Sequence, residues 1–152
     1  MNQWTKINRE TAFAYITNHS RLLVFRQTDS PDAGIQVPGG PIEPYETPSQ
    51  AVLRNARLET GLEGLILREY LGYAVVDLTR YGLNETHRRH FFHIVAPGEA
   101  PVQWLYSEPH LEHGLSAPKE LEFFWVNLPN QVPELTAELD ALIGGINLGL
   151  KS

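Results

Sequence analysis

Residues 38–62 read PGGPIEPYETPSQAVLRNARLETGL, a glycine-rich turn followed by a segment with helix signals at both ends. Thr47 can cap the helix and can form a capping box with Gln50. Gly61 can end it, because glycine readily adopts the left-handed conformation common at that position. The stretch therefore predicts a tight turn followed by a helix over residues 47–59.

This stretch also resembles the Nudix box, whose pattern is G-x5-E-x7-R-E-U-x-E-E-x-G-U. Six motif positions are filled without insertion or deletion, by Gly40, Glu46, Arg54, Glu59, Gly61 and Leu62. Two of the family's glutamates are replaced, by Asn55 and Leu58. The box is therefore degenerate, but its register is fixed.

The resemblance implies both a fold and an activity. The Nudix fold is an α/β/α sandwich around a mixed β-sheet, and Nudix enzymes cleave a nucleoside diphosphate linked to another group. In the family, the box acids hold Mg²⁺ or Mn²⁺ against the substrate diphosphate while water attacks. The resemblance thus implies a phosphoanhydride hydrolase with a small-molecule nucleoside diphosphate derivative as its substrate.

Positions 55, 58 and 59 share one side of a helix, so the family's acids form a metal-binding stripe that here reads Asn55, Leu58, Glu59. Mg²⁺ usually takes one or two carboxylates together with phosphates and water, so Glu59 meets the minimum as metal anchor and catalytic residue. Each missing charge at about 4 Å forfeits roughly 4 kcal/mol at an effective dielectric of about 20. We therefore expect weak metal affinity without substrate.

Other box residues have expected roles in the same reaction. Arg54 would orient an acid rather than touch substrate, and Asn55 could position water but cannot remove its proton. Glu46 is a second metal candidate and could equally be a structural partner of Arg54. The backbone of Gly39 and Gly40 can approach substrate closely, because neither residue has a β-carbon.

Three candidates lie outside the box. Arg88 and Arg89 point to opposite sides of a predicted strand, so at most one can reach a phosphate, and Arg89 is the substrate-binding candidate. Trp104 could stack on a base or pack its own segment against the protein. Glu122 resembles the further metal ligand that some Nudix enzymes supply from outside the box, the alternative being a solvated acid.

A long segment over residues 96–120 is rich in proline, glycine, histidine and glutamate. Loops of this length are commonly functional or mobile, so it could form a lid over the phosphate site. Within it, His110 and His113 could bind zinc together with nearby acids such as Glu112.

Alternation and turn residues predict a sheet interrupted by the box helix. A hairpin is expected around residues 18–20, with a bend or bulge at Gly72 in a later strand. Apolar residues at helical spacing predict a second helix over residues 133–143, which would cover the other face of the sheet. The expected strands are 11–17, 22–26, 34–37, 65–78, 86–96 and 121–127.

The chain has 152 residues, 42% of them hydrophobic, which predicts one domain over residues 1–152. No apolar stretch approaches about 18 residues and the start lacks the pattern of a secretory signal, so we expect a cytoplasmic protein without a membrane partner. The absence of cysteine excludes disulfides and thiolate chemistry. The net charge of -6 argues against binding to duplex nucleic acid.

Three functions therefore remain open. The first is the Nudix-type hydrolase, and the second is a catalytically impaired module that binds a nucleotide or a phosphorylated metabolite. Leu58 in the metal stripe favours the second. The third is an interaction protein, with a homodimer formed through an exposed strand or the terminal helix.

Overall fold

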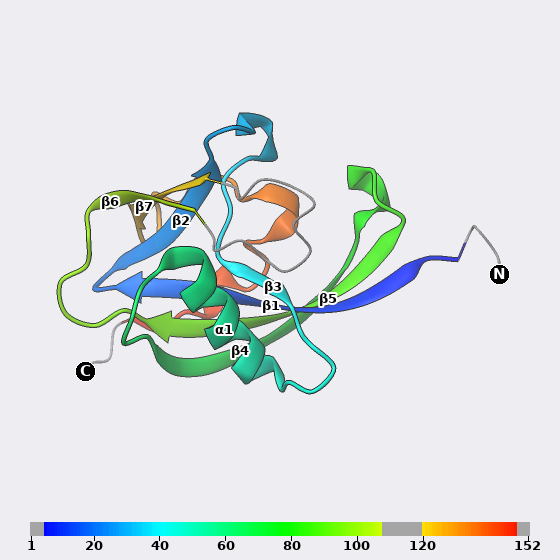
Figure 1. Ribbon diagram of the computed structural model, residues 1–152, viewed down its shortest axis with the longest axis horizontal. Coiled ribbons are helices and arrows are strands. Elements are labelled where there is room, and N and C mark those ends of the chain that lie inside the picture. Colours follow the sequence, from blue (N-terminus) through cyan, green and yellow to red (C-terminus); the bar gives the residue numbers. More distant parts are fainter. Residues whose placement is uncertain (1–4, 108–119, 149–152) are drawn as a thin grey trace.

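The computed structural model describes residues 5–107 and 120–148, whose strands form one mixed sheet (Figure 1). The strand order is β4-β5-β1-β2-β7-β6, with β3 beside β1. β1 and β5 run parallel, whereas the other neighbouring strands run antiparallel. The α/β class with a mixed sheet is confirmed. The strands are β1 (Ile7–Asn18), β2 (Arg21–Gln27), β3 (Gly39–Pro41), β4 (Ile66–Asp77), β5 (Glu85–Val95), β6 (Gln103–Ser107) and β7 (Glu120–Asn127).

Most of the expected strands are confirmed. β1 and β2 form the expected hairpin, and β4 has a register irregularity between Tyr70 and Gly72, where a bend was expected. The strand expected over residues 34–37 is wrong, because Ile35 and Gln36 make only isolated bridges. Two features limit pairing there. Gly34 has a φ of 80°, and the following Pro38 has no N–H to donate.

The helix α1 (Pro48–Thr60) has the ends that the sequence predicts. The side chain of Thr47 accepts a hydrogen bond from the Gln50 backbone, while the Gln50 side chain accepts one from the Thr47 backbone. At the other end, Gly61 is left-handed, with a φ of 74°, and its N–H donates to the carbonyl of Arg57. The turn and the helix are thus specified locally.

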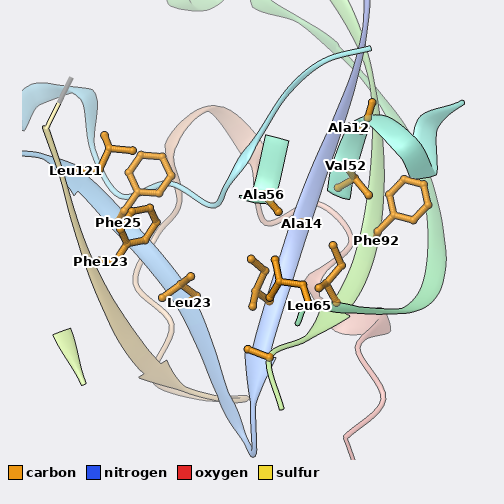
Figure 2. Close-up of a cluster of buried hydrophobic side chains, with 14 residues drawn as sticks. Ala12, Ala14, Leu23, Phe25, Val52, Ala56, Leu65, Phe92, Leu121 and Phe123 are labelled. Atoms are coloured by element: carbon orange, nitrogen blue, oxygen red, sulfur yellow. The ribbon is translucent and has the colours of Figure 1, made fainter. Parts of the chain in front are cut away.

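α1 packs on one face of the sheet through a core of small and aromatic side chains (Figure 2). Ala12 and Ala14 of β1 are fully buried, as are Val52 and Ala56 of α1. Small residues on both elements let the helix approach the sheet closely. Phe25, Phe92, Leu121 and Phe123 fill the space at the sides of this contact.

The opposite face is covered by the C-terminal segment, which is not the helix expected over residues 133–143. The segment contains only the 3₁₀ turns η3 (Thr136–Glu138) and η4 (Ile143–Gly145). Ala137 and Glu138 have φ values of 49° and 66°, which a right-handed helix cannot contain. Tertiary hydrogen bonds favour this path, because Thr136 N–H donates to the Ile35 carbonyl and the Tyr15 hydroxyl to the Leu139 carbonyl.

The apolar spacing nevertheless identified the buried side of this segment, since Leu135 and Leu139 are both buried against the sheet. Two further 3₁₀ turns, η1 (Pro31–Ala33) and η2 (Leu78–Tyr81), join strands. No helix in the described part of the chain has the length and apolarity needed to cross a membrane. His110, His113 and Glu112 lie outside the described residues.

Candidate functional site

Glu59 lies at the junction of α1 and the glycine-rich turn. Its Oε1 accepts a hydrogen bond from the backbone N–H of Gly39, over 2.7 Å. A β-carbon on Gly39 would lie 2.2 Å from a ring carbon of Phe13 and 2.7 Å from the Ala12 carbonyl oxygen. The turn therefore needs glycine at position 39 to bring this N–H to the carboxylate.

Asn55 is buried between α1 and β3. Its Nδ2 donates to the carbonyl of Ala51 over 3.0 Å and to that of Pro41 over 3.2 Å. A β-carbon on Gly40 would stand 2.6 Å from the Asn55 Oδ1, so a larger residue there would displace the Asn55 amide. A glutamate has no donor when ionised, so Asn55 ties helix to strand in a way that the family's acid could not.

Arg54 and Glu46 form a two-pronged ion pair across the turn. Arg54 Nε lies 2.5 Å from Glu46 Oε2, and Arg54 Nη2 lies 2.8 Å from Oε1. Glu46 Oε1 also accepts from the Glu43 N–H over 3.0 Å. The hydrogen bonds from Arg54 lower the pKa of the Glu46 carboxyl below its usual value. In this arrangement Arg54 contacts an acid, and that acid holds the turn.

The donors for a divalent cation are few. The described residues contain no group of three or more histidine, aspartate or glutamate side chains that could hold a metal. Glu59 supplies a carboxylate beside the turn, and Glu46 is engaged by Arg54. A hard cation with one protein carboxylate fits only if substrate phosphates and water supply its other ligands.

Glu122 is not brought to Glu59. Its neighbours Leu121 and Phe123 both belong to the core under α1, so strand alternation points Glu122 to the other face of the sheet. There Glu122 lies 3.6 Å from Arg26 and accepts a hydrogen bond from Gln103. The side chain is thus placed as a partly exposed ion-pair partner.

Arg89 is also separated from the box by the sheet. It is only 5% exposed, and its Nη1 donates to the carbonyl of Ala137 in the C-terminal segment. Its guanidinium lies 5.5 Å from the ring centroid of Phe13. Desolvation lowers the pKa of Arg89, which is what burial without a close carboxylate does to a cation.

Trp104 packs against the body of the protein. Its ring stacks on Phe123 with centroids 5.1 Å apart, and its Nε1 donates to the carbonyl of Thr60 over 3.1 Å. These contacts hold β6 against the end of α1. This placement matches the packing alternative considered for Trp104.

The carbonyl of Pro41 is a further part of the candidate site, which no side chain in the sequence predicts. It accepts from both Arg54 and Asn55, and so joins two neighbouring box positions to β3. A backbone carbonyl has no side-chain signal in a sequence. Only the pairing of β3 with β1, which aligns Pro41 with Thr11, locates it.

A NUDIX domain profile matches residues 7–140 of the chain. Several solved structures share the fold. A MutT NUDIX hydrolase from Burkholderia pseudomallei is 18% identical with a TM-score of 0.58, over 92% of this chain and 98% of that one. Curated protein sequences yield no match.

Two further structures extend the likeness. An Ap4A hydrolase from C. elegans is 15% identical with a TM-score of 0.55, over 80% of this chain and 82% of that one. A UDP-X diphosphatase is 16% identical with a TM-score of 0.58, over 93% of this chain but 62% of that one. At these identities the likeness establishes the fold alone.

Proposed function

Because this chain belongs to the Nudix family, we propose that it is a divergent hydrolase that cleaves a phosphoanhydride bond in a nucleoside diphosphate linked to another group. The observation that carries the proposal is the 2.7 Å hydrogen bond from Gly39 N–H to Glu59 Oε1. It keeps the one remaining acid of the metal stripe beside the glycine-rich turn. The proteins named above as MutT, Ap4A hydrolase and UDP-X diphosphatase favour a nucleotide derivative as substrate.

Glu59 would hold Mg²⁺ or Mn²⁺ together with substrate phosphates. When bound, such an ion neutralises charge on the diphosphate and polarises the bond to be broken. The chain's own residues position this carboxylate. Gly39 N–H orients it, Asn55 fixes the helix to Pro41, and Arg54 fixes the turn through Glu46.

The single-carboxylate site has an energetic consequence. A cation bound through one protein carboxylate loses much of the attraction that two further acids would supply, at roughly 4 kcal/mol each at about 4 Å and an effective dielectric of about 20. Substrate phosphates can replace part of that charge. We therefore expect metal and substrate to bind together, with little metal bound to the protein alone.

The test compares the wild type, Glu59→Gln and Glu63→Gln with Mg²⁺ or Mn²⁺. The substrates are ADP-ribose, dinucleoside polyphosphates, nucleoside triphosphates, nucleotide sugars and coenzyme A. Glu63 is an exposed acid just beyond the box and serves as the matched control. Metal-dependent product that disappears in Glu59→Gln and persists in Glu63→Gln supports the hydrolase. No product with any substrate contradicts it.

A second candidate function is a module that binds a nucleotide or phosphorylated metabolite without turnover. The amide of Asn55 favours it, because its Nδ2 donates to two backbone carbonyls, that of Pro41 in β3 and that of Ala51 within the helix, and so has a structural use in place of the family's acid. Saturable binding of a panel compound, measured by calorimetry, with no product after prolonged incubation would select this function.

A further inference from the structure

A cavity of about 450 Å³ lies between the first turn of α1, the edge strand β4 and its neighbour β5. Pro48 and Ser49 line it from the helix, residues 67–70 from β4, and His90 and Phe92 from β5. Its volume lies in the range of pockets that bind small molecules. It opens on the same face of the sheet as α1, since Phe92 also packs in the core beneath that helix (Figure 2).

The floor of the cavity is aromatic. The ring of Tyr70 lies 5.0 Å from that of Phe92 and 5.8 Å from that of His90, measured between centroids. Tyr70 remains 48% exposed, so part of its ring is available for contact with a ligand. A planar group can stack on such a surface, and base stacking on protein aromatics is a common source of affinity.

A hydrogen-bonded chain fixes the polar groups at this floor. His90 Nε2 lies 3.1 Å from Glu10 Oε1, and His90 Nδ1 lies 2.8 Å from the Tyr70 hydroxyl. An ionised Glu10 only accepts, so in the neutral imidazole Nε2 carries the proton and Nδ1 accepts from Tyr70. The Tyr70 oxygen then has lone pairs left as acceptors. Arg68 and Glu69, which also line the cavity, add charged donors and acceptors.

The cavity also has a fixed relation to the Nudix box. Gly40 pairs with Ala12, and Ala12 pairs with His90, so His90 lies two strands across the sheet from the glycine-rich turn. Along the helix, Pro48 and Glu59 are separated by roughly 16 Å at the α-helical rise per residue. A nucleoside diphosphate with a second group attached is an extended ligand. Its diphosphate and its base would therefore bind at different positions on the protein.

We propose that this cavity binds the nucleobase of the substrate, with the base stacked on Tyr70 and hydrogen-bonded to the polar groups around His90. This assignment rests on the proposed function, because it supplies the site for one end of the same ligand. Phe92 and Leu67 provide apolar lining, while Tyr70, Arg68 and Glu69 offer donors and acceptors for the edge of a heterocycle. Recognition of the base needs neither metal nor turnover.

The experiment titrates adenosine, guanosine, cytidine and uridine into the full-length protein in the presence of EDTA, by calorimetry. Ribose 5-phosphate is titrated in parallel as a ligand without a base. The variants are Tyr70→Leu, Tyr70→Phe and the control Tyr81→Leu, which changes an exposed tyrosine outside this cavity. Imidazole NMR signals of His90, assigned with His90→Gln, report whether the ligand binds at this place.

We expect at least one nucleoside to bind saturably and to shift the His90 signals, while ribose 5-phosphate does neither. Tyr70→Leu should weaken binding roughly tenfold or more, Tyr70→Phe should weaken it less, and Tyr81→Leu should leave it unchanged. Binding of no nucleoside, or binding that Tyr70→Leu leaves unchanged, would overturn the proposal. The proposal would also be overturned if the protein forms a dimer that Tyr70→Leu dissociates, while no nucleoside binds. In that case a second copy of the chain would occupy this surface.

These outcomes are separate from the test of hydrolysis. Nucleoside binding in EDTA, with no product from any phosphorylated substrate, would keep the base site and reject the hydrolase. Product that requires Glu59, without nucleoside binding at His90, would keep the hydrolase and reject the base site.

Discussion

The side-chain amide of Asn55 donates to the carbonyl oxygen of Pro41 over 3.2 Å, which fastens α1 to β3 at a position where the Nudix box has glutamate. The same amide donates to Ala51 within the helix. The replacement of glutamate by asparagine at position 55 therefore supplies a hydrogen bond between the helix and β3. Leu58, the other replaced position, is only partly buried and belongs to neither core cluster of the described side chains.

Restoring the acid at position 55 should destabilise the protein. In Asn55→Glu, the carbonyl of Pro41 would lose its Asn55 donor and face a carboxylate, a change that typically costs about 1–3 kcal/mol in a buried site. Urea unfolding monitored by circular dichroism measures this difference. A stability equal to that of the wild type would show that the tie between Asn55 and Pro41 contributes little.

Restoring the acid at position 58 should instead increase activity. Leu58→Glu puts a second carboxylate next to Glu59, at a position where the Nudix box has glutamate, without removing a major core side chain. We expect Mn²⁺-dependent turnover to rise roughly tenfold or more, and the Mn²⁺ concentration for half-maximal rate to fall. Leu58→Gln, which adds a polar group of similar size without charge, is the control and should not show the gain.

The ion pair between Arg54 and Glu46 should stabilise the folded protein, because Arg54 donates two parallel hydrogen bonds to the carboxylate. A double-mutant cycle with Arg54→Met and Glu46→Gln should give a coupling energy of about 1–2 kcal/mol, because two charge-assisted hydrogen bonds are lost together. Arg54→Lys should recover only part of it, since an ammonium cannot reproduce the bidentate geometry. A coupling energy near zero would contradict this stabilising role of the ion pair.

The same pair predicts an acid dependence. Arg54 lowers the pKa of Glu46 below its ordinary value of 4.5, so the folded state favours the ionised form. This contribution is present above the ordinary pKa and is lost as the pH falls through the lowered one. Unfolding free energies of wild type and Arg54→Met, measured between neutral pH and the acid limit, should therefore converge as the pH falls.

His93 predicts a second pH effect, nearer neutrality. It is buried with Nε2 2.8 Å from the Thr17 hydroxyl, and desolvation by burial lowers its pKa below 6.5. Below pH 6.5 the unfolded chain binds a proton that the folded chain does not. The free energy of unfolding should therefore decrease as the pH is lowered from about 6.5 to the lowered pKa of His93. His93→Gln should flatten this dependence. The exposed turn variant His19→Asn should retain it, and equal slopes for both variants would contradict the prediction.

Much of the fold was accessible from local sequence signals. The capping box of Thr47 and Gln50, the stop at Gly61, and the hairpin between β1 and β2 are written in adjacent residues, and all are observed. The structure of the C-terminal segment could not be predicted in the same way, because the expected helix over residues 133–143 is replaced by 3₁₀ turns. Its apolar spacing correctly predicts the buried side, but the hydrogen bonds that join Thr136 to Ile35 and Leu139 to Tyr15 favour 3₁₀ turns.

The sequence by itself determined the register of the Nudix box, the ends of its helix and the presence of Glu59 as the one acid among positions 55, 58 and 59. These follow from spacing along the chain. Only the tertiary structure decided where the distant candidates point, since the side of the sheet that Glu122 and Arg89 occupy depends on how β5 and β7 pair with other strands. It also decided that Asn55 binds Pro41, because a contact across the chain depends on packing that no local pattern records.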